Sequence, residues 1–169
     1  MSTISTAQAK PLILEALKAR EFAYVPYSKF RQVAQHGSSL VGAALLTEDG
    51  SIIRGCNVEN ASYGAGICAE RTALTKAVSE GTKKFVAIAV SSDVPAPTTT
   101  PCGICRQFIR EFCADSTPIY MVSSSFPSAE MCSDDDVLAA IENEKIVKQV
   151  TLGDLLPMSF GPENLQQTS

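Results

Sequence analysis

Residues 68–90 read CAERTALTKAVSEGTKKFVAIAV, and they predict a helix followed at once by a buried strand. Apolar residues recur at helical spacing from Cys68 to Val78, and Gly81 is of the type that most often ends a helix. The near-continuous apolar run from Phe85 to Val90 is typical of a strand covered on both faces. Together the two segments predict a β-α-β crossover, the unit that builds sheets with helices on their faces.

Upstream of this unit the sequence predicts a β-hairpin. The apolar runs Val41–Leu46 and Ile52–Cys56 are rich in residues that favour strands, and Asp49-Gly50 between them is a strong turn signal. An amphipathic opening helix is predicted between Pro11 and the break at residues 22–26, because apolar residues recur there at helical spacing. These residues are Leu12, Ile13, Ala16 and Leu17.

Downstream, strands and helices continue to alternate. A second helix is expected from Cys102 or Gly103 to Phe112, after a loop that contains three prolines. Ser133 is a suitable cap for a short helix with an acidic first turn. The remaining predicted segments are a strand at Ile119–Val122, the short helix at Asp134–Glu142, a strand at Val147–Val150 and an apolar segment at Leu155–Phe160. The alternation predicts an α/β fold, a sheet with helices on its faces.

Composition and charge narrow the possible functions. The chain has 169 residues, of which 45% are hydrophobic and 19% charged, so one compact domain over residues 1–169 is expected rather than disorder or a coiled coil. The net charge of −4 disfavours a polynucleotide partner, and no apolar stretch is long enough to span a membrane. We expect a cytoplasmic protein, in which six cysteines are free, metal-bound or catalytic rather than paired.

Three of the cysteines and one glutamate form a distinctive set. Cys102 and Cys105 make a Cys-x-x-Cys element after Pro101, and Cys68 precedes Cys102 with 33 residues between them. Alone, the Cys-x-x-Cys element could be a redox dithiol, half of a structural zinc site or chance. With Cys68 it gives three thiolates at two predicted helix starts, which fits a catalytic zinc that keeps a fourth position for water. Glu70 is then best placed as a proton carrier.

The charge of such a site needs compensation. Three thiolates around Zn²⁺ leave a net negative charge, which two helix N-termini would offset because each carries about half a positive charge. Arg71 and Arg106 directly follow ligand positions and would add to this effect. We expect Arg71 to lie behind the ligands, the alternative being an arginine on an exposed helix surface.

These motifs resemble those of the zinc-dependent cytidine deaminase superfamily, whose signature is Cys/His-x-Glu followed by Pro-Cys-x-x-Cys. The resemblance is to its small homotetrameric members and covers roughly residues 12–165. It rests on Cys68–Arg71 and Pro101–Arg106, and further on Tyr24–Phe30, Val41–Ala44, Gly55–Tyr63 and Leu155–Pro162. It implies a three-layer α-β-α fold with a mixed sheet of roughly five strands.

The resemblance also implies roles for individual residues. Cys68, Cys102 and Cys105 would bind one zinc ion per subunit, and Glu70 would shuttle protons. Asn57 and Glu59 would hold the 3′-hydroxyl of the sugar, the alternative being polar residues of an ordinary turn. The other implied substrate contacts are Phe30 and Phe160 beside the pyrimidine, Ala69, the Thr100 carbonyl at the amino group, and Ala61 and Tyr63. In the family, Ala61, Tyr63 and the segment of Phe160 reach a neighbouring subunit, which implies a homotetramer with shared active sites.

Two segments depart from the family pattern. Residues 31–40 and 124–146 read as inserts, and the first puts the placement of Phe30 in question. The only histidine, His36, lies in the first insert and is read as a solvated loop residue. The remaining cysteines are expected to be small buried apolar groups: Cys56, Cys113 and Cys132.

The function implied is zinc-dependent hydrolytic deamination of free cytidine and 2′-deoxycytidine to uridine and 2′-deoxyuridine, with release of ammonia, as in pyrimidine salvage. Zinc would acidify a water molecule, and Glu70 would move its proton to the ring nitrogen and then to the leaving amine. The main alternative is the same chemistry on a base within RNA or DNA, or on a nucleoside-like antibiotic. A non-catalytic zinc domain would need a fourth ligand, and a thiol-redox protein would leave Cys68 and Glu70 without a role.

Overall fold

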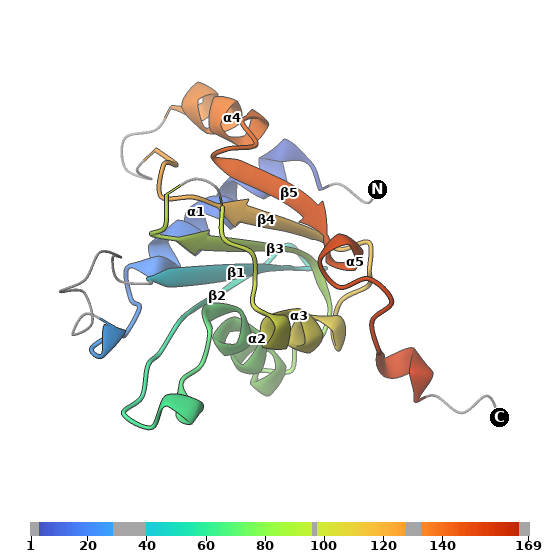
Figure 1. Ribbon diagram of the computed structural model, residues 1–169. Helices are drawn as coiled ribbons and strands as arrows, with labels where there is room; N and C mark the ends of the chain where they lie inside the picture. The colour runs from blue at the N-terminus through green and yellow to red at the C-terminus, as the bar shows by residue number, and fades with distance from the viewer. Residues whose placement is uncertain (1–3, 29–39, 96–97, 128–132, 166–169) are drawn as a thin grey trace.

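The computed structural model describes residues 4–28, 40–95, 98–127 and 133–165 (Figure 1). Twelve elements follow one another along these residues. They are α1 (Thr6–Arg20), β1 (Val41–Thr47), β2 (Ile52–Cys56), the 3-10 turn η2 (Tyr63–Ala65), α2 (Ala69–Ser79), β3 (Phe85–Ser92), α3 (Gly103–Arg110), β4 (Pro118–Val122), α4 (Asp134–Glu142), β5 (Val147–Thr151), α5 (Leu152–Leu155) and η3 (Pro162–Asn164).

The strands form one mixed sheet in the order β2-β1-β3-β4-β5. The predicted hairpin is confirmed, because β1 pairs antiparallel with β2 and Gly50 in its turn has φ +86°. β3 and β4 are parallel and are joined through α3, whereas β1 pairs antiparallel with β3 and β4 with β5. The crossover through α2 joins β2 to β3, so β1 lies between the two strands that it connects. The expected mixed five-stranded sheet is thus confirmed.

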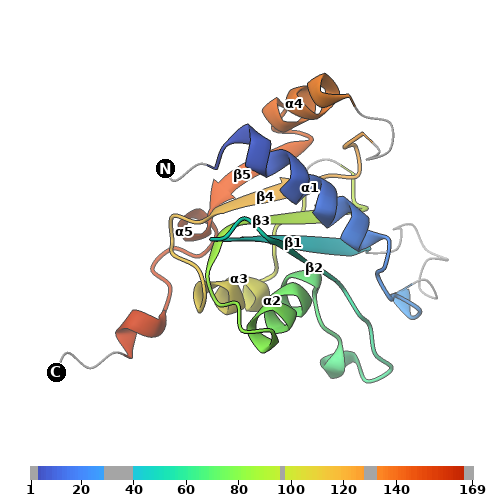
Figure 2. The same ribbon diagram turned by 180° about the vertical axis from the view of Figure 1, so that it is seen from behind.

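Helices cover both faces of the sheet and give three layers. Figure 1 shows α2 and α3 on one face, and the reverse view in Figure 2 shows α1 lying across the other. Two apolar cores separate the layers, because alternate strand residues point to opposite faces. The core under α1 and α4 includes Leu12, Ile13, Leu46, Tyr120 and Val137, and the core under α2 and α3 includes Leu45, Leu74, Ile88, Ile109 and Met121.

The first helix is longer than its sequence suggests. It begins at Thr6 rather than after Pro11, and Pro11 lies inside it. The start is set by Ser5, whose backbone N–H and hydroxyl donate to Gln8 Oε1 at 3.2 and 3.0 Å. Pro11 removes one hydrogen bond from the helix, but Leu12 and Ile13 beside it are fully buried against the sheet, and this burial outweighs the loss.

Two other helix ends follow the sequence signals. Gly81 has φ +93° and ends α2, with the Thr82 N–H donating to the Ala77 carbonyl at 2.9 Å. Ser133 caps α4 by accepting a hydrogen bond from the Asp136 N–H at 3.2 Å. Among the residues that the structure describes, no helix is long and apolar enough to cross a membrane.

Candidate metal centre

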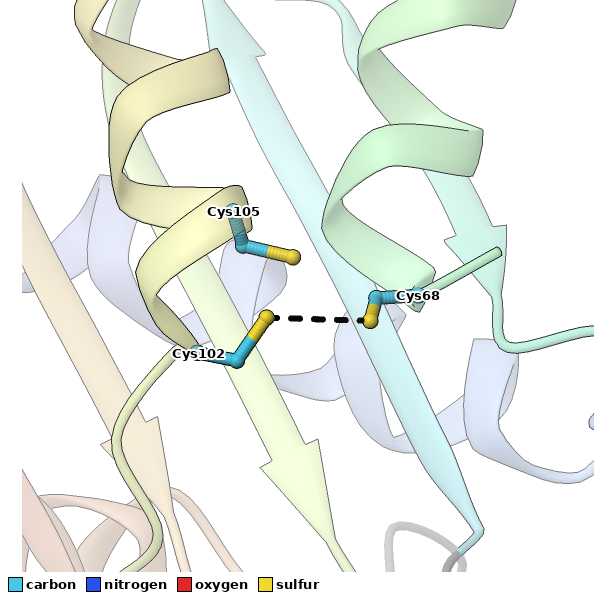
Figure 3. Close-up of side chains that lie close together, drawn as sticks. All are labelled: Cys68, Cys102 and Cys105. Atoms are coloured by element: carbon cyan, nitrogen blue, oxygen red, sulfur yellow. Dashed lines mark hydrogen bonds between the residues drawn. The ribbon is translucent and has the colours of Figure 1, made fainter. Parts of the chain in front are cut away.

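Three cysteine sulfurs meet where α2 and α3 begin (Figure 3). Cys68 is the N-cap of α2, Cys102 is the N-cap of α3, and Cys105 follows in the first turn of α3. The sulfur atoms lie within 4.8 Å of one another, and Cys68 Sγ is 3.9 Å from Cys102 Sγ. The two helix starts are adjacent because both helices pack on the same face of the sheet.

The spacing of the sulfurs fits a tetrahedral metal. Zn–S bonds of about 2.3 Å place two thiolates on one zinc roughly 3.8 Å apart, whereas a disulfide would need about 2.05 Å. The Cys68 to Cys102 separation of 3.9 Å matches the first value, and all three cysteines are free thiols. Thiolates are soft ligands that zinc binds well, so three sulfur donors also suit this ion. The residues present therefore fit a zinc ion with one position open.

The surroundings favour negative charge on the sulfurs. A hydrogen bond from the Cys105 thiol, with Arg71 and Cys102, lowers the pKa of Cys68 to about 5. The same bond raises the pKa of Cys105, since losing its proton beside a thiolate is unfavourable. Arg71 Nη2 lies 3.8 Å from Cys68 Sγ, so the structure brings this arginine to the ligands. The helix N-termini add their partial positive charge, and a dication would let all three sulfurs ionise.

Glu70 lies beside the sulfurs in the first turn of α2. Only 4% of its surface is exposed, and burial raises the pKa of its carboxyl group above the usual value. It nevertheless lines the same cavity as Cys68 and Cys102. A buried carboxyl that opens only onto a cavity can exchange protons with whatever occupies that cavity.

A cavity of about 500 Å³ opens in front of the cysteines, within the usual size range of small-molecule sites. Several of the site residues predicted from the sequence line this cavity. Those that line it are Asn57, Glu59, Tyr63, Cys68, Glu70, Thr100 and Cys102. Other parts of the wall come from the N-terminal loop at Tyr27 and Ser28 and from the strand ends at Val41, Val90 and Ser92.

Asn57 and Glu59 also fix the wall of the cavity. The Val41 N–H donates to Asn57 Oδ1 at 2.9 Å, which ties the loop after β2 to the start of β1. Glu59 accepts hydrogen bonds from the Tyr27 and Ser28 N–H groups at 2.9 and 3.0 Å, and from the Ser28 hydroxyl. Burial would raise the pKa of Glu59, but these hydrogen bonds outweigh it and lower the pKa. Glu59 is therefore held as a carboxylate that faces this loop.

Other predicted site residues lie elsewhere. Ala69 is fully buried as the first residue of α2, Ala61 is exposed outside the cavity lining, and Phe160 is 59% exposed and does not line the cavity either. Phe30, together with His36 and Cys132, falls outside the described residues. Cys113 is buried as expected. Cys56 is not, because it ends the edge strand β2, where its thiol contacts the Phe22 carbonyl at 3.2 Å.

Arg106 has a role that the sequence did not reveal. Its guanidinium donates to the Pro101 carbonyl at 2.7 Å, to Thr100 Oγ1 at 2.8 Å and to the Leu155 carbonyl at 2.8 Å. It thus ties the loop that carries Cys102 to the segment after β5. The sequence predicted only a charge next to a ligand, because it could not show that residue 155 returns to this loop.

A second arginine of α3 holds the C-terminal segment. The Arg110 side chain is 10% exposed and pairs with Asp115 at 3.0 Å and with Glu163. It also donates to Ser159 Oγ at 2.9 Å, while Gln107 Nε2 donates to the Phe160 carbonyl at 3.0 Å. These bonds hold the Ser159 side chain, the Phe160 carbonyl and the Glu163 side chain, and they leave the Phe160 ring exposed.

The chain is similar to known proteins over most of its length. A family model described as the cytidine and deoxycytidylate deaminase zinc-binding region matches residues 9–121. A cytidine deaminase of Sporosarcina psychrophila is 44% identical over 154 residues, covering 91% of this chain and 92% of that protein. One of Halalkalibacterium halodurans is 45% identical over 154 residues, covering 91% and 95%. The crystal structure of cytidine deaminase from Burkholderia pseudomallei has 36% identity and a TM-score of 0.70, covering 93% of this chain and all of that one.

Proposed function

The chain belongs to the cytidine and deoxycytidylate deaminase zinc-binding family, and from this membership we propose how its residues carry out the reaction. The protein is a zinc-dependent hydrolase that deaminates cytidine. We assign the zinc ligands to Cys68, Cys102 and Cys105. The observation that carries this assignment is the convergence of these sulfurs within 4.8 Å beside a buried carboxyl group, at a cavity of about 500 Å³.

Glu70 is the proton carrier in this proposal. Cys68, Cys102 and Cys105 would hold the zinc ion, which would supply an acidified water molecule in the cavity. Glu70 takes one proton from this water and delivers it to the ring nitrogen N3, while the water oxygen forms a bond to C4 of the base. Glu70 then moves the remaining proton of the added hydroxyl group to the N4 amine and the C4–N4 bond breaks, so cytidine and water become uridine and ammonia. Burial, which raises the pKa of Glu70, suits a group that must hold this proton between transfers.

The substrate assignment extends to 2′-deoxycytidine. Asn57 and Glu59 both line the cavity and are held by fixed hydrogen bonds, which suits the recognition of a sugar hydroxyl. The Thr100 carbonyl would accept from the amino group of the base, and Ala69 would contact it through the backbone. A net charge of −4 argues against RNA or DNA as the substrate. Phe30 keeps its proposed place beside the pyrimidine.

We further propose a homotetramer with shared active sites. Tyr63 and Phe160 are 69% and 59% exposed, and Ala61 is exposed as well. The exposed Phe160 ring, which lies outside the cavity of its own chain, suits an interface in which it completes a neighbouring cavity. We also propose one domain over residues 1–169, with inserts at 31–40 and 124–146, a cytoplasmic location and a role in pyrimidine salvage.

One combined measurement tests the function. The purified protein is assayed for the loss of cytidine absorbance, and the same sample is analysed for zinc per chain. We expect turnover of cytidine and 2′-deoxycytidine with one zinc per chain. Zinc without turnover of either nucleoside would favour a structural zinc domain, and oxidation to a Cys102–Cys105 disulfide in place of zinc would favour thiol redox chemistry. Deamination confined to single-stranded RNA or DNA would overturn the substrate assignment.

A further inference from the structure

Ser92 is a residue of the cavity wall whose hydroxyl group is buried. It is the last residue of β3, only 5% of its surface is exposed, and it lines the same cavity as Cys68, Glu70 and Asn57. Its Oγ has no hydrogen-bond partner among the residues that the structure describes. Because buried hydroxyl groups are nearly always hydrogen-bonded, a solitary one at the edge of a ligand cavity points to a partner outside the chain.

The neighbouring Ser91 is in the opposite situation. Successive residues of a strand point to opposite faces, so Ser91 faces the layer of α1. There its hydroxyl accepts a hydrogen bond from Arg20 Nη1 at 3.2 Å. Arg20 Nη1 also donates to the Ser92 carbonyl at 2.6 Å, which fixes the backbone of Ser92 without using its side chain. The Ser91 hydroxyl group is thus hydrogen-bonded within the fold, whereas that of the adjacent Ser92 is not.

The strand register places Ser92 near the Asn57 side of the cavity. Ser92 is the direct partner of Val41 in the pairing of β1 with β3. Val41 in turn exchanges two hydrogen bonds with Asn57, one to the amide oxygen of its side chain and one between the backbones. Val41, Asn57 and Ser92 all line the cavity. Ser92 therefore adds a second polar side chain to a wall that contains Asn57 and the apolar Val41 and Val90.

We propose that Ser92 is a substrate-binding residue whose hydroxyl group hydrogen-bonds to the nucleoside in this cavity. The proposal rests on the deaminase function given above and adds a contact to it. Without ligand, the hydroxyl group contributes nothing to the fold through hydrogen bonding. Its effect is seen when the nucleoside binds, and it appears in KM rather than in folding stability.

The experiment compares Ser92→Ala with Ser91→Ala, a matched control one residue away. For Ser92→Ala we expect KM for cytidine to rise roughly 2- to 12-fold, the range for loss of one ordinary hydrogen bond. Its Tm and zinc content should equal or exceed those of the unmodified protein. Ser91→Ala should keep the original KM and lower Tm instead. Ser92→Thr, which retains a hydroxyl group, should recover at least part of the affinity.

An unchanged KM in Ser92→Ala would overturn the proposal. If the Tm of that variant fell at the same time, the hydroxyl would be a structural group. Failure of the deaminase function itself is distinguishable, because the unmodified protein would then show no cytidine turnover before any variant is compared.

Discussion

The helix that carries Glu70 touches a strand through backbone at Gly55 and Ala73. A Cβ atom at Gly55 would lie 2.4 Å from the Ala73 nitrogen and 2.8 Å from the Ala69 carbonyl oxygen. Contacts below about 3.0 Å are not seen for real Cβ atoms, and both obstructing atoms belong to helix backbone that cannot turn aside. Gly55 thus sets how deeply the first turn of α2 seats against β2, and with it the positions of Cys68 and Glu70.

Gly55→Ala should therefore push α2 away from the sheet. We expect a loss of folding stability on the order of 1–3 kcal/mol, as for other overpacked cores. Zinc content should fall with it, since Cys68 moves relative to Cys102. Thermal unfolding and zinc analysis check both effects. Gly64→Ala is the control, because nothing lies within 4 Å of a Cβ at that position, and equal losses in both variants would contradict the argument.

Glu70→Gln should separate zinc binding from catalysis. The amide has nearly the same shape as the carboxyl group but cannot carry the proton. We expect zinc per chain to stay unchanged while kcat falls by at least 10²- to 10⁴-fold, the usual contribution of a general acid-base. Turnover within a few-fold of the original would remove Glu70 from the mechanism.

Cys102→Ala should abolish metal binding instead. The variant leaves two sulfur donors where a catalytic zinc site needs three protein ligands. We expect zinc per chain to drop toward zero and turnover to disappear with it. Cys56→Ala serves as the control, because Cys56 lies outside the sulfur cluster. Full zinc occupancy in Cys102→Ala would show that the ligand set is wrong.

Arg106→Gln should loosen the loop in front of the cysteines. The guanidinium holds the Pro101 carbonyl, the Thr100 hydroxyl and the Leu155 carbonyl, and glutamine cannot reach all three. We expect kcat/KM for cytidine to fall about 10-fold or more, because each hydrogen bond to a charged group contributes roughly 1.5–3 kcal/mol. Arg54→Gln is the control, since Arg54 makes only a partly exposed ion pair with Glu15 at 3.2 Å. Similar kinetics in the two variants would show that the hydrogen bonds of Arg106 do not position this loop for catalysis.

Phe160→Ala tests the shared active site. If the ring completes a neighbour's cavity, the variant should show a raised KM for cytidine. Mixing it with Glu70→Ala subunits and allowing them to exchange should restore a low KM, because the intact Phe160 of one subunit then serves the intact Glu70 of another. No recovery, in a mixture shown to contain mixed oligomers, would mean that Phe160 acts within its own chain.

Local sequence signals predicted most of the elements, for identifiable physical reasons. The Asp49-Gly50 turn and the helix ends at Gly81 and Ser133 depend on groups a few residues apart, so the sequence contains the whole interaction. The metal centre was also predictable, because three cysteines and a glutamate at this spacing have few roles other than binding a catalytic metal. The prediction failed at Pro11, where the burial of Leu12 and Ile13 on a sheet formed much later in the chain outweighed a local signal.

By itself the sequence determined the sheet-and-helix alternation, the helix ends at Gly81 and Ser133 and the chemical character of the metal centre. Tertiary structure alone decided that Ser92 lines the cavity while Ser91 faces α1. It also decided that Arg106 donates to the Leu155 carbonyl and that Arg110 forms an ion pair with Glu163. The latter contacts join residues 49 and 53 positions apart, and the serine pair depends on which face of β3 each helix covers. Such choices are settled by how the apolar faces of the whole chain pack together, which no short stretch of residues encodes.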